Sequence, residues 1–159
     1  MKPLDTELNR VILEITRAMF PQGFDVSRDA PETIEGLRAH VARTGRMIVT
    51  DANSETTIYG RASVNVAFRA WHDATHLETG ADFSLEGESA VCEAQCKRVA
   101  LHASPQSFPA QARRFAEIIR AEIIGQARHF ATHGVFPVAQ AAFVAAYMQQ
   151  PNAALARVW

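Results

Sequence analysis

Four polar side chains recur at helical spacing in residues 65–76. Asn65, Arg69, His72 and His76 stand at positions i, i+4, i+7 and i+11. At about 100° per residue, these positions share one face of an α-helix. Two histidines one turn apart can bind one metal ion through their imidazole nitrogens. The spacing therefore predicts a metal site with His72 and His76 as ligands, and a metal-free, hydrogen-bonded histidine pair is the alternative.

Two carboxylates are candidates for completing that site. Glu122 lies in a run of isoleucines, which draws it toward the interior, and a buried carboxylate needs a cation or hydrogen-bond donors. Glu88 falls in the first turn of the helix that follows the histidines, so the chain brings it toward the His76 end. Both are predicted metal ligands. The alternatives are an ion pair between Glu122 and Arg69, and an interaction of Glu88 with the positive end of its own helix.

This donor set limits the metal and the chemistry. Two imidazoles with one or two carboxylates suit zinc with an open coordination position, or ferrous iron, while more carboxylates would favour manganese. Asp73, next to His72, is expected to accept a proton from metal-bound water or to orient an imidazole. Arg69 is expected to hold a small anionic substrate, unless it pairs with Glu122 or Asp73.

The elements that must position these residues are mostly helices. Apolar periodicity, capping residues, glycine and proline predict six of them, followed by a short turn near the C-terminus that returns Leu155 and Trp159 to the core. The helices are expected at residues 5–19, 31–45, 63–79, 84–102, 109–133 and 136–150. A break is expected at residues 104–109, which hold two prolines.

One stretch has a different pattern. Residues 47–50 and 56–59 are rich in β-forming side chains, and the five residues between them favour turns. This pattern predicts a β-hairpin at about residues 46–60, lying on the helices because an isolated hairpin is marginally stable. The predicted fold class is mainly α: a single domain over residues 1–159, a bundle of about six helices with one small β-hairpin.

Composition excludes several functional classes. The 159 residues are 48% hydrophobic and 21% charged, with a net charge of −1, which argues against binding of nucleic acid through its phosphates. No apolar run has transmembrane length and no signal peptide is evident.

Cys92 and Cys96, four residues apart, are expected to be reduced core residues in a cytoplasmic protein, with thiolate ligation of a metal as the alternative. His129 and His133 are expected at a solvated helix end.

The segment from Phe68 to His76, with its Trp-His-Asp-x-x-His pattern, resembles one found in small uncharacterised proteins of phages and prophages. The likeness extends through Phe83 and Glu88 to Glu122 and covers roughly residues 48–147. It implies a phage or prophage origin and no particular activity.

Three better-known families share fewer features. The order His40, His72, Asp73 is similar to that of the ligands in HD-type phosphohydrolases, but no aspartate follows Asp82, so Glu122 would have to serve as the late ligand. Zincin peptidases have two histidines at i and i+4, with a glutamate directly after the first one; here that residue is Asp73, and a third ligand is not obvious. The Glu-x-x-His pattern of ferritin-like proteins is missing from the sequence.

The leading expectation is a metal-dependent hydrolase acting on a phosphoester or nucleotide-type substrate. The alternative is a non-enzymatic phage accessory or interaction protein in which the metal or polar cluster fixes helix packing. An enzyme needs an open coordination position, while a structural site is closed. An iron-dependent oxygenase is a third and weaker expectation.

Overall fold

The computed structural model describes residues 2–102 and 108–159. Most of the break expected at residues 104–109 therefore lies outside the described residues. The chain divides into two compact units, Met1–Phe83 and Ser84–Trp159. The predicted mainly α fold class is confirmed. Among the described residues, no helix combines the length and the hydrophobicity needed to cross a lipid bilayer.

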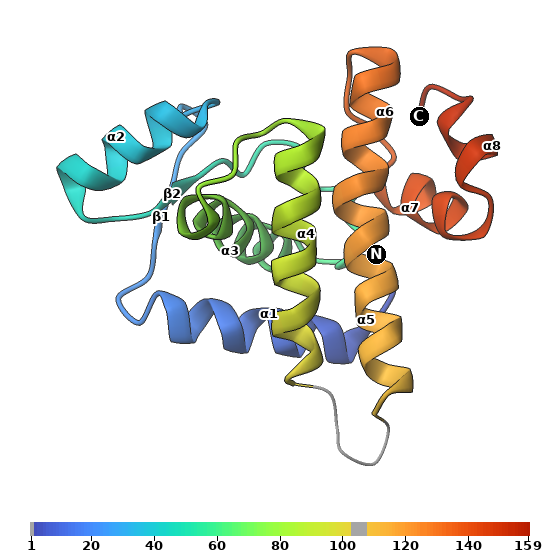
Figure 1. The fold of residues 1–159 in the computed structure, drawn as a ribbon, viewed down its shortest axis with the longest axis horizontal. Helices are drawn as coiled ribbons and strands as arrows, with labels where there is room; N and C mark the ends of the chain where they lie inside the picture. Colours follow the sequence, from blue (N-terminus) through green and yellow to red (C-terminus); the bar gives the residue numbers. More distant parts are fainter. Residues whose placement is uncertain (1, 103–107) are drawn as a thin grey trace. The chain divides into compact units, whose positions relative to one another are not determined.

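The first unit contains three helices and two short strands (Figure 1). Their bounds are α1 Thr6–Met19, β1 Asp25–Val26, α2 Ile34–Thr44, β2 Ile48–Val49 and α3 Ala62–Thr79. Asp5 caps α1, since its side chain accepts hydrogen bonds from the backbone N–H groups of Glu7 and Leu8. Gly80, at φ 74°, ends α3 in the left-handed conformation that glycine adopts without steric cost. The helix that carries the histidine pair therefore begins and ends close to where the sequence predicts.

The predicted hairpin is wrong. The two strands β1 and β2 pair in parallel, with Asp25 opposite Ile48 and Val26 opposite Val49. Residues 56–59 form no strand, because their backbone carbonyls are used elsewhere. The carbonyl of Ile58 accepts from the N–H of Leu4, and that of Tyr59 accepts from the Asn9 side chain.

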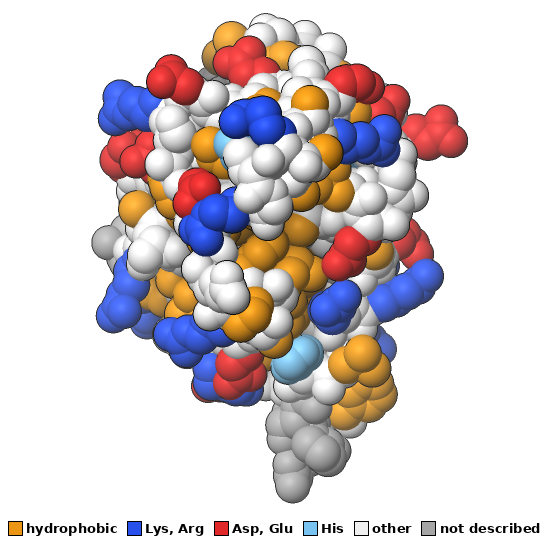
Figure 2. Space-filling model, turned by 90° about the vertical axis from the view of Figure 1, so that its left-hand side faces the viewer, with side chains coloured by type: hydrophobic (Ala, Val, Ile, Leu, Met, Phe, Trp, Pro, Cys, Tyr) orange, Lys and Arg blue, Asp and Glu red, His pale blue; other side chains and the backbone are white. Residues whose placement is uncertain are grey.

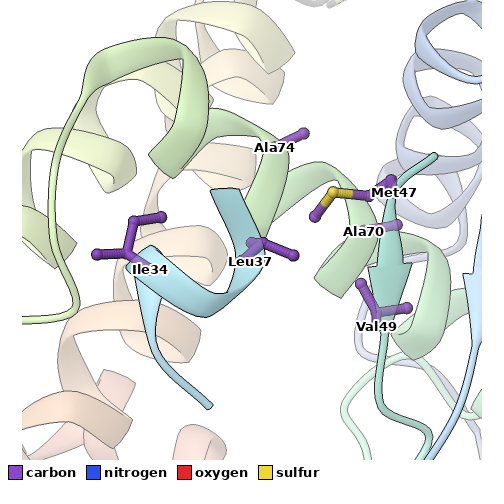
Figure 3. Close-up of a cluster of buried hydrophobic side chains, with 6 residues drawn as sticks. All are labelled: Ile34, Leu37, Met47, Val49, Ala70 and Ala74. Carbon is purple, nitrogen blue, oxygen red and sulfur yellow. The ribbon is translucent and has the colours of Figure 1, made fainter. Parts of the chain in front are cut away.

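A hydrophobic cluster joins α2, β2 and α3 (Figure 3). Its buried members are Ile34, Leu37, Met47, Val49, Ala70 and Ala74. Ala70 and Ala74 are one helical turn apart, so the small residues of α3 form one apolar side on which α2 and β2 lie. The cluster fixes the side of α3 on which these two elements pack.

The second unit is wholly helical in its described part. Its elements are α4 Leu85–Ala100, α5 Ala110–Arg120, the π-helix η1 Ala121–Gly125, α6 Gln126–His133, α7 Gln140–Gln149 and α8 Pro151–Leu155. Segments α5, η1 and α6 follow one another without a gap, and α4 lies beside α5 (Figure 1). The long helix expected at residues 109–133 is thus present, with a π-helical turn inside it.

The C-terminal turn returns to the core as predicted. The indole N–H of Trp159 donates to the carbonyl of Ala154, and the ring lies 5.9 Å from that of Phe143. Helix α8 adds a seventh helical segment to the six expected.

Candidate metal centre

His72 and His76 point the same way from α3, as the spacing predicts. Their Nε2 atoms are 3.1 Å apart, and their ring centroids are 4.7 Å apart. Two nitrogens that bind one zinc ion at about 2.05 Å in a tetrahedral arrangement lie about 3.3 Å apart. The observed separation is therefore close to the one that a shared metal ion requires, and it also allows a direct hydrogen bond between the rings.

The surroundings of His76 fix its proton. The side chain is fully buried at 0% exposure, and Nδ1 lies 3.3 Å from the carbonyl oxygen of Ala81. Because a carbonyl only accepts, Nδ1 carries the proton of the neutral ring and Nε2 keeps its lone pair. A backbone carbonyl behind a histidine is a common way of orienting a metal ligand.

Aromatic rings hold both imidazoles in place. Phe83 meets His76 edge to face at 4.7 Å, and Phe68 stacks against His72 at 6.0 Å. His72 is only partly buried, whereas His76 is enclosed. The pair thus combines a buried, oriented ring with a more accessible one.

His72, His76 and Glu88 form a group that can hold a metal ion. Each offers one ligand atom: a ring nitrogen from each histidine and a carboxylate oxygen from Glu88. Glu88 is in the first turn of α4, and five residues separate the end of α3 from the start of α4. It is the one such group found among the described residues.

Glu122 does not belong to that group. It is 6% exposed and lies in the π-helical segment η1. Single π-helical turns are frequent at functional sites, because the extra residue redirects side chains. Its burial agrees with the sequence expectation, and its role as a metal ligand stays a prediction.

Asn65 and Arg69, which precede the histidines on the same face of α3, hold a loop in place. Arg69 donates through Nη1 to the backbone carbonyls of Thr50 and Ala52. Asn65 donates to the hydroxyl of Ser54 and accepts from that of Thr57. These two side chains hold the loop that follows β2 against α3, a role that the sequence did not predict because the partners come from an irregular segment.

Asp73 is half-buried on α3 beside the histidines. The proposed catalytic roles of Asp73 and Arg69 stay predictions. Both residues lie on α3, the helix that carries the histidine pair. Asp73 is one residue after His72, and Arg69 is three residues before it.

For the second histidine pair, the prediction of a solvated helix end is wrong for His129. Its ring is 0% exposed, with Nδ1 2.9 Å from the carbonyl oxygen of Val135. His133 contacts the carbonyl of Leu155 through Nε2 at 2.8 Å. Each ring thus connects α6 to a backbone carbonyl that comes later in the chain.

Cys92 and Cys96 are free thiols and both are buried. The hydrogen bond with Cys96, together with burial, raises the pKa of the Cys92 thiol. Cys96 itself contacts the carbonyl of Ala116 at 3.8 Å. The expected reduced core thiols are therefore present, and neither belongs to the metal-binding group.

Comparison with known proteins gives no relative: no family model, no curated protein and no solved structure matches this chain.

Proposed function

We propose that this protein is a metal-dependent hydrolase of phosphoester or nucleotide-type substrates, of phage or prophage origin. The observation that carries the proposal is the 3.1 Å separation of the His72 and His76 Nε2 atoms, with the proton of His76 fixed on the opposite ring nitrogen. A nitrogen with a fixed lone pair beside a second imidazole nitrogen makes a site suited to zinc, with iron or manganese as alternatives.

The ligand set leaves room for chemistry. Two histidines and Glu88 give three protein ligands, the number that catalytic zinc sites use while keeping a fourth position for water. A zinc ion in such a site lowers the pKa of its bound water to about 7. Partial exposure of His72 supports access to this position.

Asp73 and Arg69 supply the remaining functions. In the proposed reaction, water attacks phosphorus, its proton passes to the Asp73 carboxylate, and the bond from phosphorus to the leaving oxygen breaks. The departing oxygen then takes up a proton from solvent. Arg69, three residues before His72 on α3, adds positive charge that favours an anionic substrate.

Hydrolysis of bis(p-nitrophenyl) phosphate and of p-nitrophenyl phosphate by zinc- or manganese-loaded protein tests the proposal. We expect metal-dependent release of nitrophenolate, and a loss of about 10²-fold or more in Asp73→Asn, as for removal of a general base. Asp51→Asn, in the exposed loop after β2, is the matched control and should keep full activity.

The structural alternative gives a different result. A chain that binds one metal ion but hydrolyses neither substrate has a closed site whose ion fixes helix packing, and this result would overturn the hydrolase proposal. The full burial of His76 is the observation that favours this second candidate.

A further inference from the structure

A second set of metal-ligating side chains lies in the interior of the second unit. Cys92 and Cys96 of α4 are free thiols, and they are only 2% and 7% exposed. On the outer face drawn in Figure 2, by contrast, acidic and basic side chains are interspersed, so that neither sign of charge prevails there. Sulfur is a soft ligand that distinguishes among metal ions, and we therefore ask what the thiol pair can bind.

The two thiols lie close enough to share one ligand. They are one helical turn apart on α4 and hydrogen-bonded to each other. The Cβ atoms of residues at this spacing are about 5–6 Å apart, whereas a disulfide needs about 3.5–4.5 Å. Oxidation to a disulfide would therefore distort the helix. An ion inserted between the two sulfur atoms makes a longer bridge and removes this conflict.

The surroundings of the pair favour loss of a proton from Cys96. The hydrogen bond from Cys92 lowers the pKa of the Cys96 thiol, against the opposing effect of burial. The positive charge of Arg120 on α5 acts in the same direction, and the negative charge of Glu93 opposes it. Because the thiolate is the form of cysteine that binds metals, one of the two sulfur atoms is prepared for ligation.

The number of donors selects the metal. Among residues 2–102 and 108–159, no third histidine, cysteine, aspartate or glutamate joins the two thiols in a metal-binding group. Structural zinc sites almost always have four ligands, so the pair does not suit zinc. Cu(I) is a soft ion that prefers thiolates, and two of them in a linear arrangement satisfy it.

Helix α5 closes the pair from water. It lies against α4, and the carbonyl oxygen of Ala116 is 3.8 Å from Cys96 Sγ. An apolar enclosure controls the access of solvent to a metal site. Water is thus kept from supplying the further ligands that zinc and other borderline ions need.

We propose that Cys92 and Cys96 bind one Cu(I) ion between their sulfur atoms. Two Cu–S bonds form, the two S–H bonds break, and the two protons pass to solvent. The resulting bis-thiolate group carries one negative charge, which the nearby charge of Arg120 partly offsets. None of its ligands belongs to the histidine site, so this proposal does not depend on the hydrolase activity.

Competition with bicinchoninate, a Cu(I) chelator whose complex is coloured, tests the proposal on the full chain under anaerobic, reducing conditions. We expect the wild type to take up about one Cu(I) ion per chain. Cys92→Ala and Cys96→Ala should each weaken binding at least about a hundredfold, since even the loss of an outer partner of a ligand costs about 10–100-fold. His72→Ala, which leaves both thiols in place, should keep the wild-type affinity.

A charge variant tests the contribution of Arg120. Arg120→Gln should weaken Cu(I) binding about twofold to fivefold, as for a partly screened charge. Arg113→Gln removes the same charge two helical turns earlier on α5 and should leave binding unchanged. Far-UV circular dichroism checks that each variant keeps its helices.

Protection of the thiols in the wild type gives a measurement that needs no variant. N-ethylmaleimide reaches buried thiols only when the helices open locally, and mass spectrometry counts the modified cysteines. Free Cu(I) at a hundred times its Kd should slow this alkylation about a hundredfold.

Three outcomes would overturn the proposal. A wild type that leaves all the Cu(I) with the chelator would show that the thiols only fill the core, and so would an alkylation rate that Cu(I) does not change. Uptake that is lost in His72→Ala but kept in both cysteine variants would assign the ion to the histidine pair.

Discussion

At the scale of single residues, the proton on His76 decides what the histidine pair can do. With Nδ1 donating to Ala81 and the ring fully buried, Nε2 of His76 keeps its lone pair and lies 3.1 Å from Nε2 of His72. The same α3 stripe uses Asn65 and Arg69 to hold a loop through backbone and hydroxyl groups. One face of one helix thus carries both a ligand pair and the anchor of an adjacent segment.

Arg69→Ala tests the anchoring role. The carbonyls of Thr50 and Ala52 would each lose a charged donor, so we expect a loss of about 1–3 kcal/mol in the free energy of unfolding. Urea denaturation measures this loss, and limited proteolysis should show faster cleavage in residues 50–59. Zinc stoichiometry should stay the same.

Arg28→Ala is the matched control for this variant. Its side chain is 83% exposed and lies 3.9 Å from Asp51, so its removal should change stability by less than about 0.5 kcal/mol. Unchanged stability in Arg69→Ala, together with loss of zinc, would show that Arg69 serves the metal site and not the loop.

The sequence predicted the direction of these side chains but not their partners. Helical period places Asn65, Arg69, His72 and His76 on one face, and this is confirmed. The partners lie in irregular segments: Ala81 follows the helix end, and Thr50 and Ala52 follow a strand. Spacing fixes where a residue points on its own helix, whereas what lies opposite is decided by tertiary contacts.

At the scale of elements, the long helix of the second unit contains a feature that apolar periodicity does not reveal. The π-helical segment η1 inserts one wide turn between α5 and α6, and Glu122 lies within it. The predicted hairpin failed for a similar reason. Of the two β-rich runs only one contains a strand: Ile48 and Val49 pair with the distant residues Asp25 and Val26, a choice of partner that local sequence does not encode.

Gly125→Ala tests the packing of η1. An added Cβ would lie 3.1 Å from the ring of Tyr147 and 3.4 Å from that of Phe143, which is overpacking in a filled core. We expect a loss of about 1–3 kcal/mol, seen as a lower thermal midpoint. Ala131→Ser, at an exposed position of α6, is the control. A midpoint for Gly125→Ala equal to that of the wild type would show that α7 can move away from η1.

At the scale of the whole molecule, a bound metal ion contributes to the free energy of unfolding. A protein of this size is stable by about 5–15 kcal/mol, and a ligand that binds only the native state adds about 2.7 kcal/mol at a hundred times its Kd. His72, His76 and Glu88 come together only in the folded chain. The free energy of unfolding of the intact protein should therefore rise when zinc is added. This rise should disappear when either His72 or His76 is replaced by alanine.

Zinc stoichiometry of the purified full chain, measured by equilibrium dialysis and elemental analysis, tests the metal centre most directly. We expect about one zinc ion per wild-type chain, as for a three-ligand site, and less than about 0.2 zinc ions per chain in His72→Ala and in His76→Ala. Glu88→Gln should bind zinc more weakly, and the control His40→Ala should bind it as the wild type does. Equal zinc content in the wild type and in both histidine variants would contradict the account.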